Sequence, residues 1–268
     1  MTLSQTPRPT LSPRLLFLPM ASFALWTLAA APAHAQDASP AFADGQSQWG
    51  LGLAASFERK PYRGIGTDTS AIPLLTYENR WVSVFGPGID LKLPSAGPVS
   101  FRLRARYSGE GYEADDSPFL AGMDKRKDGF WLGGAALWRT GLADVSAELL
   151  GDASGNSKGY RFKLAVERRF QSGAFDFTPR VAAVRLDKKY VDYYYGVKTT
   201  EVQAGRGFYA GESTVNLEAG LRIGYALAPK QNLFLDVSAT RLGSGIKDSP
   251  IVEKSSQSAV RIGYLYRF

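Results

Sequence analysis

The residues best suited to acid–base chemistry lie in one polar stretch, where Asp115, Asp116 and Asp124 precede Lys125-Arg126-Lys127. Two neighbouring carboxylates can divide the roles of general acid and general base. A lysine beside a serine could likewise activate a nucleophile. Opposite charges placed side by side in a polar stretch are, however, typical of a solvated loop, and we interpret this stretch in that way. The sequence predicts no catalytic residues and no enzyme.

Histidine and cysteine, the usual side chains of nucleophilic and metal chemistry, are almost absent. The chain has no cysteine, and its only histidine is His34. His34 lies in a segment that we expect to be removed, so the mature chain would have neither an imidazole nor a thiol. Ser-His and Cys-His pairs are then impossible, and zinc, haem and copper lose their usual ligands. We therefore expect no cofactor and no metal site.

Residues 1–35 have the organisation of a secretory signal peptide. They contain two arginines and no acidic residue, and the arginines precede a short apolar run. The run leads to Ala33-His34-Ala35, a cleavage site of the A-x-A type. Pro19 interrupts the run, which falls short of the roughly 20 residues that a membrane-spanning helix needs. We expect export with cleavage after Ala35, so that the mature chain starts at Gln36.

Most of the remaining chain consists of short segments in which apolar and polar residues alternate. The clearest segment runs from Val215 to Leu227. Alternate side chains of a strand point to opposite faces. Segments of about ten residues with this pattern are typical of strands in an outer-membrane β-barrel. Aromatic girdles at the two membrane surfaces are expected from residues near segment ends, namely Trp49, Trp81, Tyr107, Trp131, Trp138, Tyr160, Tyr225 and Tyr264.

The C-terminal segment shows the same alternation and ends on an aromatic residue. Tyr264, Tyr266 and Phe268 share one face, whereas Arg261 and Arg267 lie on the other. A final strand with outward aromatics and a terminal phenylalanine resembles the closing strand of bacterial outer-membrane barrels. We expect these three aromatic residues to form the signal for barrel assembly.

The lengths of the connections predict which end of the barrel faces the periplasm. Short turns alternate with longer polar loops, as periplasmic turns alternate with outer loops in these barrels. The short turns are 94–97, 139–141, 171–173 and 229–232, and the longer loops are 108–128, 152–158, 188–213 and 243–256.

The number of strands depends on residues 71–92. A barrel with both ends in the periplasm needs an even number of strands, and this region is interrupted by Pro73 and by Gly86-Pro87-Gly88. One long, bulged strand here gives ten strands in all, which we favour. Division at Gly86 gives twelve, although the pieces would be shorter than a spanning strand. The predicted fold is an all-β transmembrane antiparallel barrel over residues 48–268, preceded by a short periplasmic segment at 36–47.

Several motifs, found in order along the chain, carry a family resemblance. They are Lys60-Pro61-Tyr62-Arg63-Gly64, Leu149-Leu150-Gly151-Asp152 with Asn156-Ser157 and Gly159, Tyr193-Tyr194-Tyr195-Gly196-Val197, Thr240-Arg241-Leu242, and Asp248-Ser249-Pro250-Ile251-Val252 with Lys254-Ser255. Together they resemble the MipA/OmpV family of outer-membrane proteins over essentially all of residues 48–268. The resemblance implies an outer-membrane barrel. In the best-known member it also implies a scaffold that links a murein-cleaving lytic transglycosylase to a murein-synthesising penicillin-binding protein.

The expected function is therefore that of an outer-membrane scaffold in peptidoglycan metabolism, with a small channel or a surface adhesin as the alternatives. The expected partners are outer-membrane lipid, the barrel-assembly machinery and, from the resemblance, those two murein enzymes. Nucleic acid is not expected, because the chain is exported and its net charge of +7 is spread along the strands. Inward arginines favour an anion channel, whereas pairing with inward carboxylates would fill the lumen.

The candidate loop contacts have two interpretations each. Tyr193, Tyr194 and Tyr195 could bind a sugar or a protein through their aromatic faces, or they could pack the loop against the barrel rim. Ser249 and Pro250 could contact a partner, or they could shape a turn.

Overall fold

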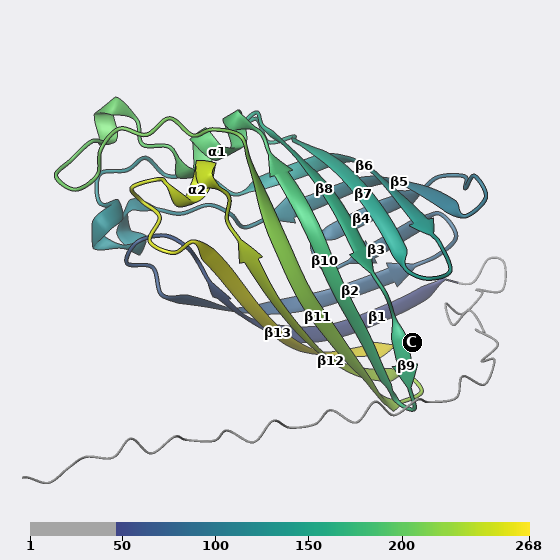
Figure 1. The fold of residues 1–268 in the computed structure, drawn as a ribbon. Helices are drawn as coiled ribbons and strands as arrows, with labels where there is room; N and C mark the ends of the chain where they lie inside the picture. The colour runs from purple at the N-terminus through teal and green to yellow at the C-terminus, as the bar shows by residue number, and fades with distance from the viewer. Residues whose placement is uncertain (1–46) are drawn as a thin grey trace, which may run out of the picture. The chain divides into compact units, whose positions relative to one another are not determined.

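The computed structural model describes residues 47–268, which form one antiparallel sheet that closes on itself as a barrel (Figure 1). The ring is completed where the last strand, β13, pairs with the first, β1. The strands are β1 (Gln48–Arg59), β2 (Thr67–Glu78), β3 (Val82–Phe85), β4 (Gly88–Lys92), β5 (Val99–Ser108), β6 (Gly129–Arg139), β7 (Asp144–Asp152), β8 (Tyr160–Glu167), β9 (Phe170–Ser172), β10 (Phe175–Leu186), β11 (Thr214–Ala228), β12 (Gln231–Arg241) and β13 (Ser256–Arg267). The loops contain α1 (Lys188–Tyr195), α2 (Ser244–Lys247) and the 3-10 turns η1 (Ala114–Asp116), η2 (Pro118–Leu120) and η3 (Thr199–Glu201). The predicted all-β barrel is confirmed.

The barrel wall within residues 47–268 consists of twelve strands, because β8 and β9 are two parts of one strand. Both pair with β10, one at each end, and Arg168-Arg169 separates them. The sequence favoured ten strands and kept twelve as the alternative, so the favoured number was wrong. The even number leaves residues 48 and 268 at the same end of the barrel.

The additional strands lie within residues 71–92, where one bulged strand was expected. Asn79 makes the first turn, and its Oδ1 accepts hydrogen bonds from the amides of Trp81 and Val82 at 2.8 and 2.6 Å. Gly86-Pro87 makes the second turn, where Gly86 has a φ of +54°, a conformation that glycine adopts without steric cost. Because β3 and β4 have only 4 and 5 residues, an argument from spanning length could not find them.

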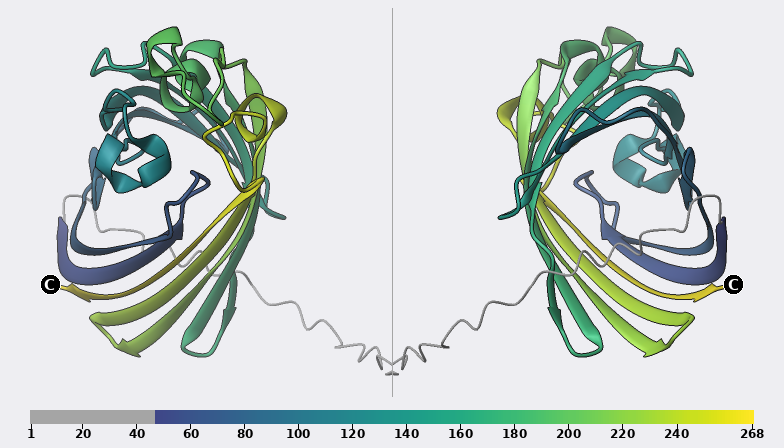
Figure 2. Two further views of the ribbon diagram at one scale, coloured as in Figure 1. Left: turned by 90° about the vertical axis from the view of Figure 1, so that its left-hand side faces the viewer. Right: turned by 90° about the vertical axis from the view of Figure 1, so that its right-hand side faces the viewer.

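The strands curve around a common axis (Figure 2). They present apolar side chains to the outside. Leu53, Leu103 and Leu217 are 68%, 51% and 56% exposed. In a membrane this face meets acyl chains instead of water, so its exposure carries no hydrophobic penalty. Trp131 departs from the predicted girdle, because it pairs with Arg106 on the inward face and is fully buried.

The two ends of the barrel differ in their connections (Figure 1). Long loops gather at one end, which is the outer end by the rule for these barrels, and short turns connect the strands at the other. One outer connection, the turn at 86–87, is as short as a periplasmic one. No helix within residues 47–268 is long and apolar enough to cross a membrane.

Candidate functional site: the outer cap and the lumen

The long loops pack together into one body, which we call the outer cap and define as residues 60–66, 109–128, 187–213 and 242–255. These loops come from different sides of the barrel, since they follow β1, β5, β10 and β12. The cap shares one apolar core with residues of β6, β7 and β10, and the cap residues of this core include Tyr62, Tyr112, Leu120, Met123, Val191, Val197, Ile246, Ile251 and Val252. Backbone contacts also join the loops, for example from the Arg63 amide to the Ile251 carbonyl at 2.9 Å. Burial therefore holds together loops that lie far apart in the sequence.

The helix α1 contributes the tyrosine cluster of the cap. The Asp187 side chain caps its first turn by accepting a hydrogen bond from the Tyr190 amide at 3.0 Å, which satisfies an otherwise free donor. Tyr194 and Tyr195 are buried, whereas Tyr193 is partly exposed. The three tyrosines thus pack the loop inside the cap, and a role for them as contacts with an external molecule stays a prediction.

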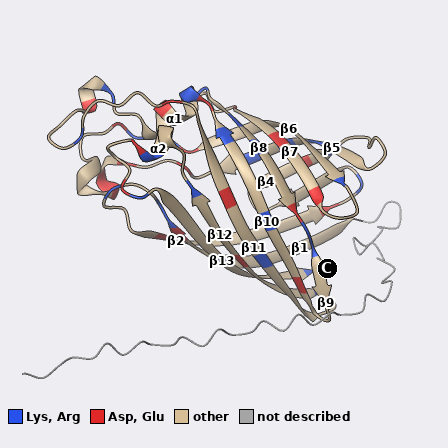
Figure 3. Cartoon of the chain, viewed as in Figure 1, with Lys and Arg blue, Asp and Glu red and all other residues tan. Residues whose placement is uncertain are grey.

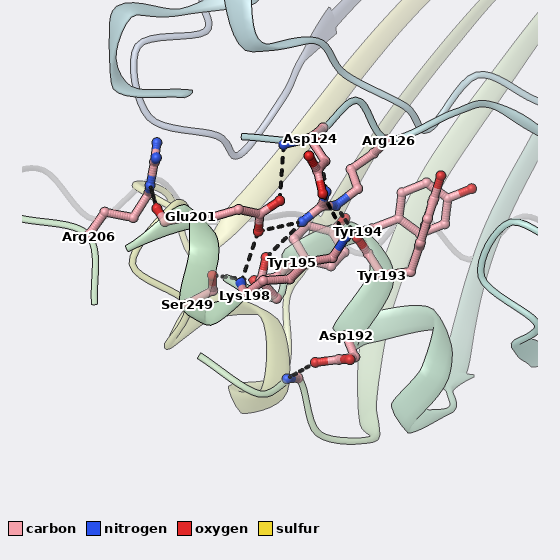
Figure 4. A network of polar contacts seen from close by, with 12 residues as sticks. Asp124, Arg126, Asp192, Tyr193, Tyr194, Tyr195, Lys198, Glu201, Arg206 and Ser249 are labelled. Atoms are coloured by element: carbon pink, nitrogen blue, oxygen red, sulfur yellow. Dashed lines mark hydrogen bonds and ion pairs between the residues drawn. The ribbon is translucent and has the colours of Figure 1, made fainter. Parts of the chain in front are cut away.

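A buried ion pair lies at the centre of the cap (Figure 4). Arg126 Nη2 donates to Glu201 Oε2 at 2.8 Å, and both side chains are only 2% exposed. The carboxylate also accepts hydrogen bonds from the amides of Asp124 at 3.0 Å and Lys198 at 2.9 Å. Arg126 further donates to the Tyr193 carbonyl at 2.6 Å. Each charge is therefore paired and hydrogen-bonded, as burial of an ion pair requires.

The surroundings of the pair favour its charged form. Burial alone would raise the pKa of the Glu201 carboxyl, but the hydrogen bonds from Arg126 and from the Lys198 and Asp124 amides hold that pKa below its ordinary value. Burial would lower the pKa of the Arg126 guanidinium, and the hydrogen bond to Glu201 raises it instead. Partner interactions thus outweigh desolvation on both sides of the pair.

A second buried arginine fastens the longest loop to the turn that contains η2. Arg206, 1% exposed, donates to the carbonyl oxygens of Phe119, Ala121 and Glu201 at 2.5, 3.0 and 2.9 Å. Its guanidinium has several donors in a fixed plane, so one side chain can serve three carbonyls. Arg126 and Arg206 therefore link the two largest loops of the cap.

The predicted contact residues Ser249 and Pro250 join the last loop to the rest of the cap. The Ser249 hydroxyl donates to the Tyr195 carbonyl at 2.6 Å and is buried. The Pro250 carbonyl accepts from Arg63 Nε at 3.0 Å. Both residues are thereby brought close to α1 and to the first loop. Contact with a partner at these positions stays a prediction.

A hollow of about 330 Å³ opens on the surface of the cap beside α1. Its lining includes Lys189, Tyr193, Lys198, Phe208 and Tyr209. Aromatic faces and ammonium groups together would suit an anionic or sugar-like molecule. Tyr193 is therefore the predicted loop tyrosine that is best placed to meet an external ligand.

Residues of both charges occur along the strands of the barrel (Figure 3), and charged side chains that face the lumen form ion pairs. Arg104 bridges Asp90 and Glu148, with N–O distances of 2.6 and 2.5 Å. On the other side of the barrel, Asp236 accepts from Arg180 at 2.8 Å and from Arg222 at 3.2 Å. Lys163 and Glu218 form a further pair. The predicted pairing of inward arginines with inward carboxylates is present in the structure.

One arginine also crosses the lumen. The guanidinium carbon of Arg222, on β11, lies 5.6 Å from the ring centroid of Phe234 and 5.8 Å from that of Phe85. Phe85 belongs to β3, which is separated from β11 in the sheet by β12, β13, β1 and β2. Contacts of a guanidinium with two aromatic rings are favourable, and here they connect opposite walls. The Arg222–Phe85 contact therefore joins side chains of two strands that lie on different sides of the lumen.

Sequence reasoning missed the residues that link the loops of the cap and the phenylalanine that contacts Arg222 in the lumen. Arg126 was interpreted as part of a solvated loop, and Glu201, Arg206 and Phe85 were not singled out. Arg126 and Glu201 are 75 positions apart, and each lies among polar neighbours, so spacing gives no signal for their pairing. Phe85 belongs to a strand that is separate only in the alternative count of twelve.

The other predicted residues belong to the expected cleavage site and to the C-terminal strand. Ala33, Ala35 and Gln36 fall outside residues 47–268, so cleavage of the signal stays a prediction. Tyr264 and Tyr266 face outward beside Leu53 and Leu51 of β1, and the Phe268 amide donates to the Trp49 carbonyl at 2.9 Å. The last residue thus takes part in closing the barrel, and its role as an assembly signal stays a prediction.

Comparison with known proteins gives a family match and several similar proteins. The family model "MltA-interacting protein MipA" matches residues 51–268. The MltA-interacting protein of Escherichia coli (strain K12) is 26% identical over 235 residues, which cover 86% of this chain and 94% of that protein. Outer membrane protein OmpV of Vibrio cholerae serotype O1 is 30% identical over 161 residues, 60% of this chain and 63% of that protein. The NanC porin structure aligns with a TM-score of 0.43 and 10% identity, over 81% of this chain and 98% of that one.

The family match covers nearly the whole described barrel, and the Vibrio cholerae relative is named an outer membrane protein. The outward apolar band and the long loops at one end are those of a protein that resides in the bacterial outer membrane. The chain belongs to the MltA-interacting protein MipA family of outer-membrane β-barrel proteins.

Proposed function

We propose that this barrel is a scaffold that holds a murein-cleaving lytic transglycosylase, and with it a murein-synthesising penicillin-binding protein, at the periplasmic face of the outer membrane. The name of the Escherichia coli relative, an MltA-interacting protein, supports an interaction with an enzyme of the first kind. No enzymatic activity of the barrel itself is included in the proposal. The protein would act by placing its partners.

The observation that carries this proposal is the contrast between the two ends of the barrel. At the outer end the loops are tied to one another by a common core and by buried arginines. The lumen contains ion pairs and the Arg222–Phe85 contact. A barrel that is closed in this way is better suited to anchoring than to transport, which leaves its periplasmic rim as the surface for partners.

The periplasmic rim is basic. Arg80, Arg139, Lys230 and Arg267 lie at or beside the short turns and are exposed. Charges of one sign around a rim attract an oppositely charged surface and orient it during encounter. We propose this basic rim, defined by these four residues, as the surface that receives an acidic face of the partner enzyme.

Reversal of charges on the rim should weaken capture of the transglycosylase. We expect the variant Arg80→Glu/Arg139→Glu/Lys230→Glu to retain roughly a tenth of the wild-type enzyme, because each tenfold loss needs only about 1.4 kcal/mol. The measurement is co-purification from detergent-solubilised envelopes, at matched amounts of folded, heat-modifiable barrel.

The matched control carries the same number of reversals at the other end, as Lys127→Glu/Lys189→Glu/Lys247→Glu. These lysines are exposed on the outer loops, and capture should stay unchanged. Loss of capture in the control and not in the rim variant would place the interface outside the cell. An adhesin or a ligand-binding protein would then be the better description.

The N-terminal periplasmic segment, residues 36–47, would add to this interface. Specific stable interfaces bury roughly 1,200–2,000 Å², which short turns supply only with difficulty. We therefore propose weak association, with dissociation constants in the micromolar range or above, to which residues 37–46 contribute. Almost all of this segment lies outside the described residues.

The alternative of a small channel rests on the inward arginines, and conductance in a planar bilayer tests it. We expect the wild type to conduct little and the variant Phe85→Ala/Arg222→Ala to conduct several-fold more, because the substitutions remove the contact across the lumen. Arg180 still pairs with Asp236 in that variant, so the barrel should fold. Arg261→Ala is the control, since Arg261 reaches Asp236 only at 4.0 Å. Steady, anion-selective conductance of the wild type would favour the channel.

A further inference from the structure

The barrel wall has a gap at the outer end of β2. β1 pairs with β2 along its whole length, from Thr67 to Glu78, whereas β3 pairs only with residues 76–78. The hydrogen bond from the Gly86 amide to the Leu75 carbonyl, at 3.0 Å, is the last between β2 and this hairpin. Among residues 47–268, no strand pairs with that edge of residues 67–74. On the far side, the bond from the Tyr107 amide to the Pro87 carbonyl ends the pairing of the hairpin with β5.

We call this gap the lateral window, bounded by β2 residues 67–74, the turn at 86–87 and the outer end of β5. Thr67 to Ala71, five consecutive residues, are exposed on both faces of the strand. The window exists because one hairpin of the wall, β3 with β4, is far shorter than its neighbours.

The height of the window follows from the register of β1 with β2. Leu53 lies opposite Pro73, and Phe57 opposite Thr69. For a strand tilted by about 40°, the distance from Trp49 to Phe57 along the membrane normal is roughly 20 Å. This height is close to that of the apolar band of such barrels, ~25 Å. Pro73 is thus near the middle of the membrane and Thr69 near its outer surface. The window opens on the outer leaflet.

The chemistry of the window is apolar on both faces. Alternation is suspended at Ala71-Ile72-Pro73-Leu74-Leu75, so the inward residues Ile72 and Leu74 are as apolar as the outward ones. Leu74 is 5% exposed, and the ring of Phe85 lies on the lumen side of the same wall, facing Arg222. A hydrocarbon chain could therefore lie against apolar side chains along the β2 edge of the window. Arg106 lies at the opposite edge, beside Gly88.

Pro73 argues against another strand as the occupant. The Leu75 carbonyl points to the side of β2 on which the hairpin lies. The backbone groups of every second residue of a strand point to the same side, so those of Pro73 point to the window. Proline has no amide hydrogen, so it interrupts the ladder that an added strand would need, and proline on an open edge is a known protection against such pairing. An acyl chain needs no hydrogen bonds from the edge.

A polar hollow lies at the outer end of the window. It measures about 180 Å³ and is lined by Lys60, Ile65, Thr67, Asp68 and Asp116, the last from η1. Lys60 Nζ lies 3.1 Å from Asp68 Oδ2. Polar and charged groups at the membrane surface, above an apolar opening, match the order of headgroup and chain in an amphiphile.

We propose that the lateral window admits an acyl chain of an outer-leaflet amphiphile into the lumen. The site is independent of the scaffold proposal, since it lies in the outer half of the wall and uses none of the rim residues.

The test uses the absence of cysteine from the chain, which permits a single fluorescent bimane label. Thr76→Cys reports on the lumen just below the window, because Thr76 faces Gly50 inside the wall and is paired on both sides. Leu53→Cys reports on the lipid face, and Ser238→Cys on the lumen near Asp236, on β12. The folded protein is placed in phosphatidylcholine vesicles whose acyl chains carry bromine, a short-range quencher.

We expect quenching at Thr76 comparable with that at Leu53 and several-fold greater than at Ser238. Ile72→Glu, which places a carboxylate on the inner lip, should lower quenching at Thr76 to the Ser238 level and leave Leu53 unchanged. Equal quenching at Thr76 and Ser238 in the variants that keep Ile72 would overturn the proposal, whether or not the glutamate variant folds. The proposal would also be overturned if Thr69→Cys formed disulfide-linked dimers and the bimane at position 76 were not quenched. That result would assign the window to a second copy of the chain.

Discussion

Replacement of Glu201 by alanine should destabilise the outer cap by about 3–5 kcal/mol, because it leaves a buried arginine without its partner. Arg126 is 2% exposed at the side chain, so water cannot replace the lost carboxylate. The amides of Asp124 and Lys198 would lose their acceptor as well. Limited proteolysis of the folded barrel should show early cleavage in the loop at 187–213, while the strands remain protected.

An exposed ion pair of the same cap provides the control. Lys125 and Glu113 are 57% and 50% exposed, and removal of an exposed partner typically costs about 0–1 kcal/mol. Glu113→Ala should therefore leave the proteolysis pattern of the cap unchanged. If Glu201→Ala behaved in the same way, the buried pair would not hold the cap. Partial rescue by Arg126→Met in the Glu201→Ala background would show that the unpaired charge causes the loss.

The same pair predicts how acid affects the cap. The folded state lowers the pKa of Glu201, so its contribution to stability is complete above the pKa of a free glutamate, about 4.3, and declines as the pH falls through the lower, folded value. Acidification should therefore raise the rate of loop cleavage in the wild type. In Glu201→Gln, which is uncharged at every pH, this part of the pH dependence should disappear.

The strand pattern could be predicted because lipid and lumen impose opposite demands on alternate residues. Val215 to Leu227 shows this alternation without interruption, and the structure places Arg222 of that segment against Asp236 in the lumen. The alternation of apolar and polar residues is lost where the inward face is also apolar. Residues 71–75 lie beside the lateral window, so both faces meet apolar surroundings, and the alternation on which strand counting depends is lost there.

The outer cap could not be predicted, because its contacts join loops of unrelated sequence. The loop around Arg126 is as polar as any solvated loop, and only the fold brings Glu201 to it from 75 positions away. Trp131 illustrates a related difficulty. Its place near a segment end suggested the girdle, but its register opposite Arg106 turns it inward. A shift of one residue decides between lipid and lumen, and composition near a strand end does not determine it.

Register also determines the cost of substitutions at the centre of β11. Leu221 lies opposite Pro179 and Val237 on the outward face, at the middle of a 15-residue strand, and Arg222 pairs with Asp236 inside. An arginine on the lipid face near the midplane costs about 2–4 kcal/mol, whereas substitutions inside the lumen are milder. Leu221→Arg should therefore lower the folded, heat-modifiable fraction far more than Arg222→Leu does.

The comparison between neighbouring positions removes the effect of location along the strand. In Arg222→Leu the carboxylate of Asp236 keeps its two hydrogen bonds from Arg180, at 2.8 and 2.9 Å, so no unpaired charge remains in the lumen. In Leu221→Arg the new guanidinium can reach water only by displacing lipid or by bending toward a membrane surface. The measurement is the free energy of unfolding in vesicles, or the heat-modifiable fraction on gels. If Arg222→Leu were the more damaging of the two, the lipid and lumen faces of β11 would be the reverse of those described.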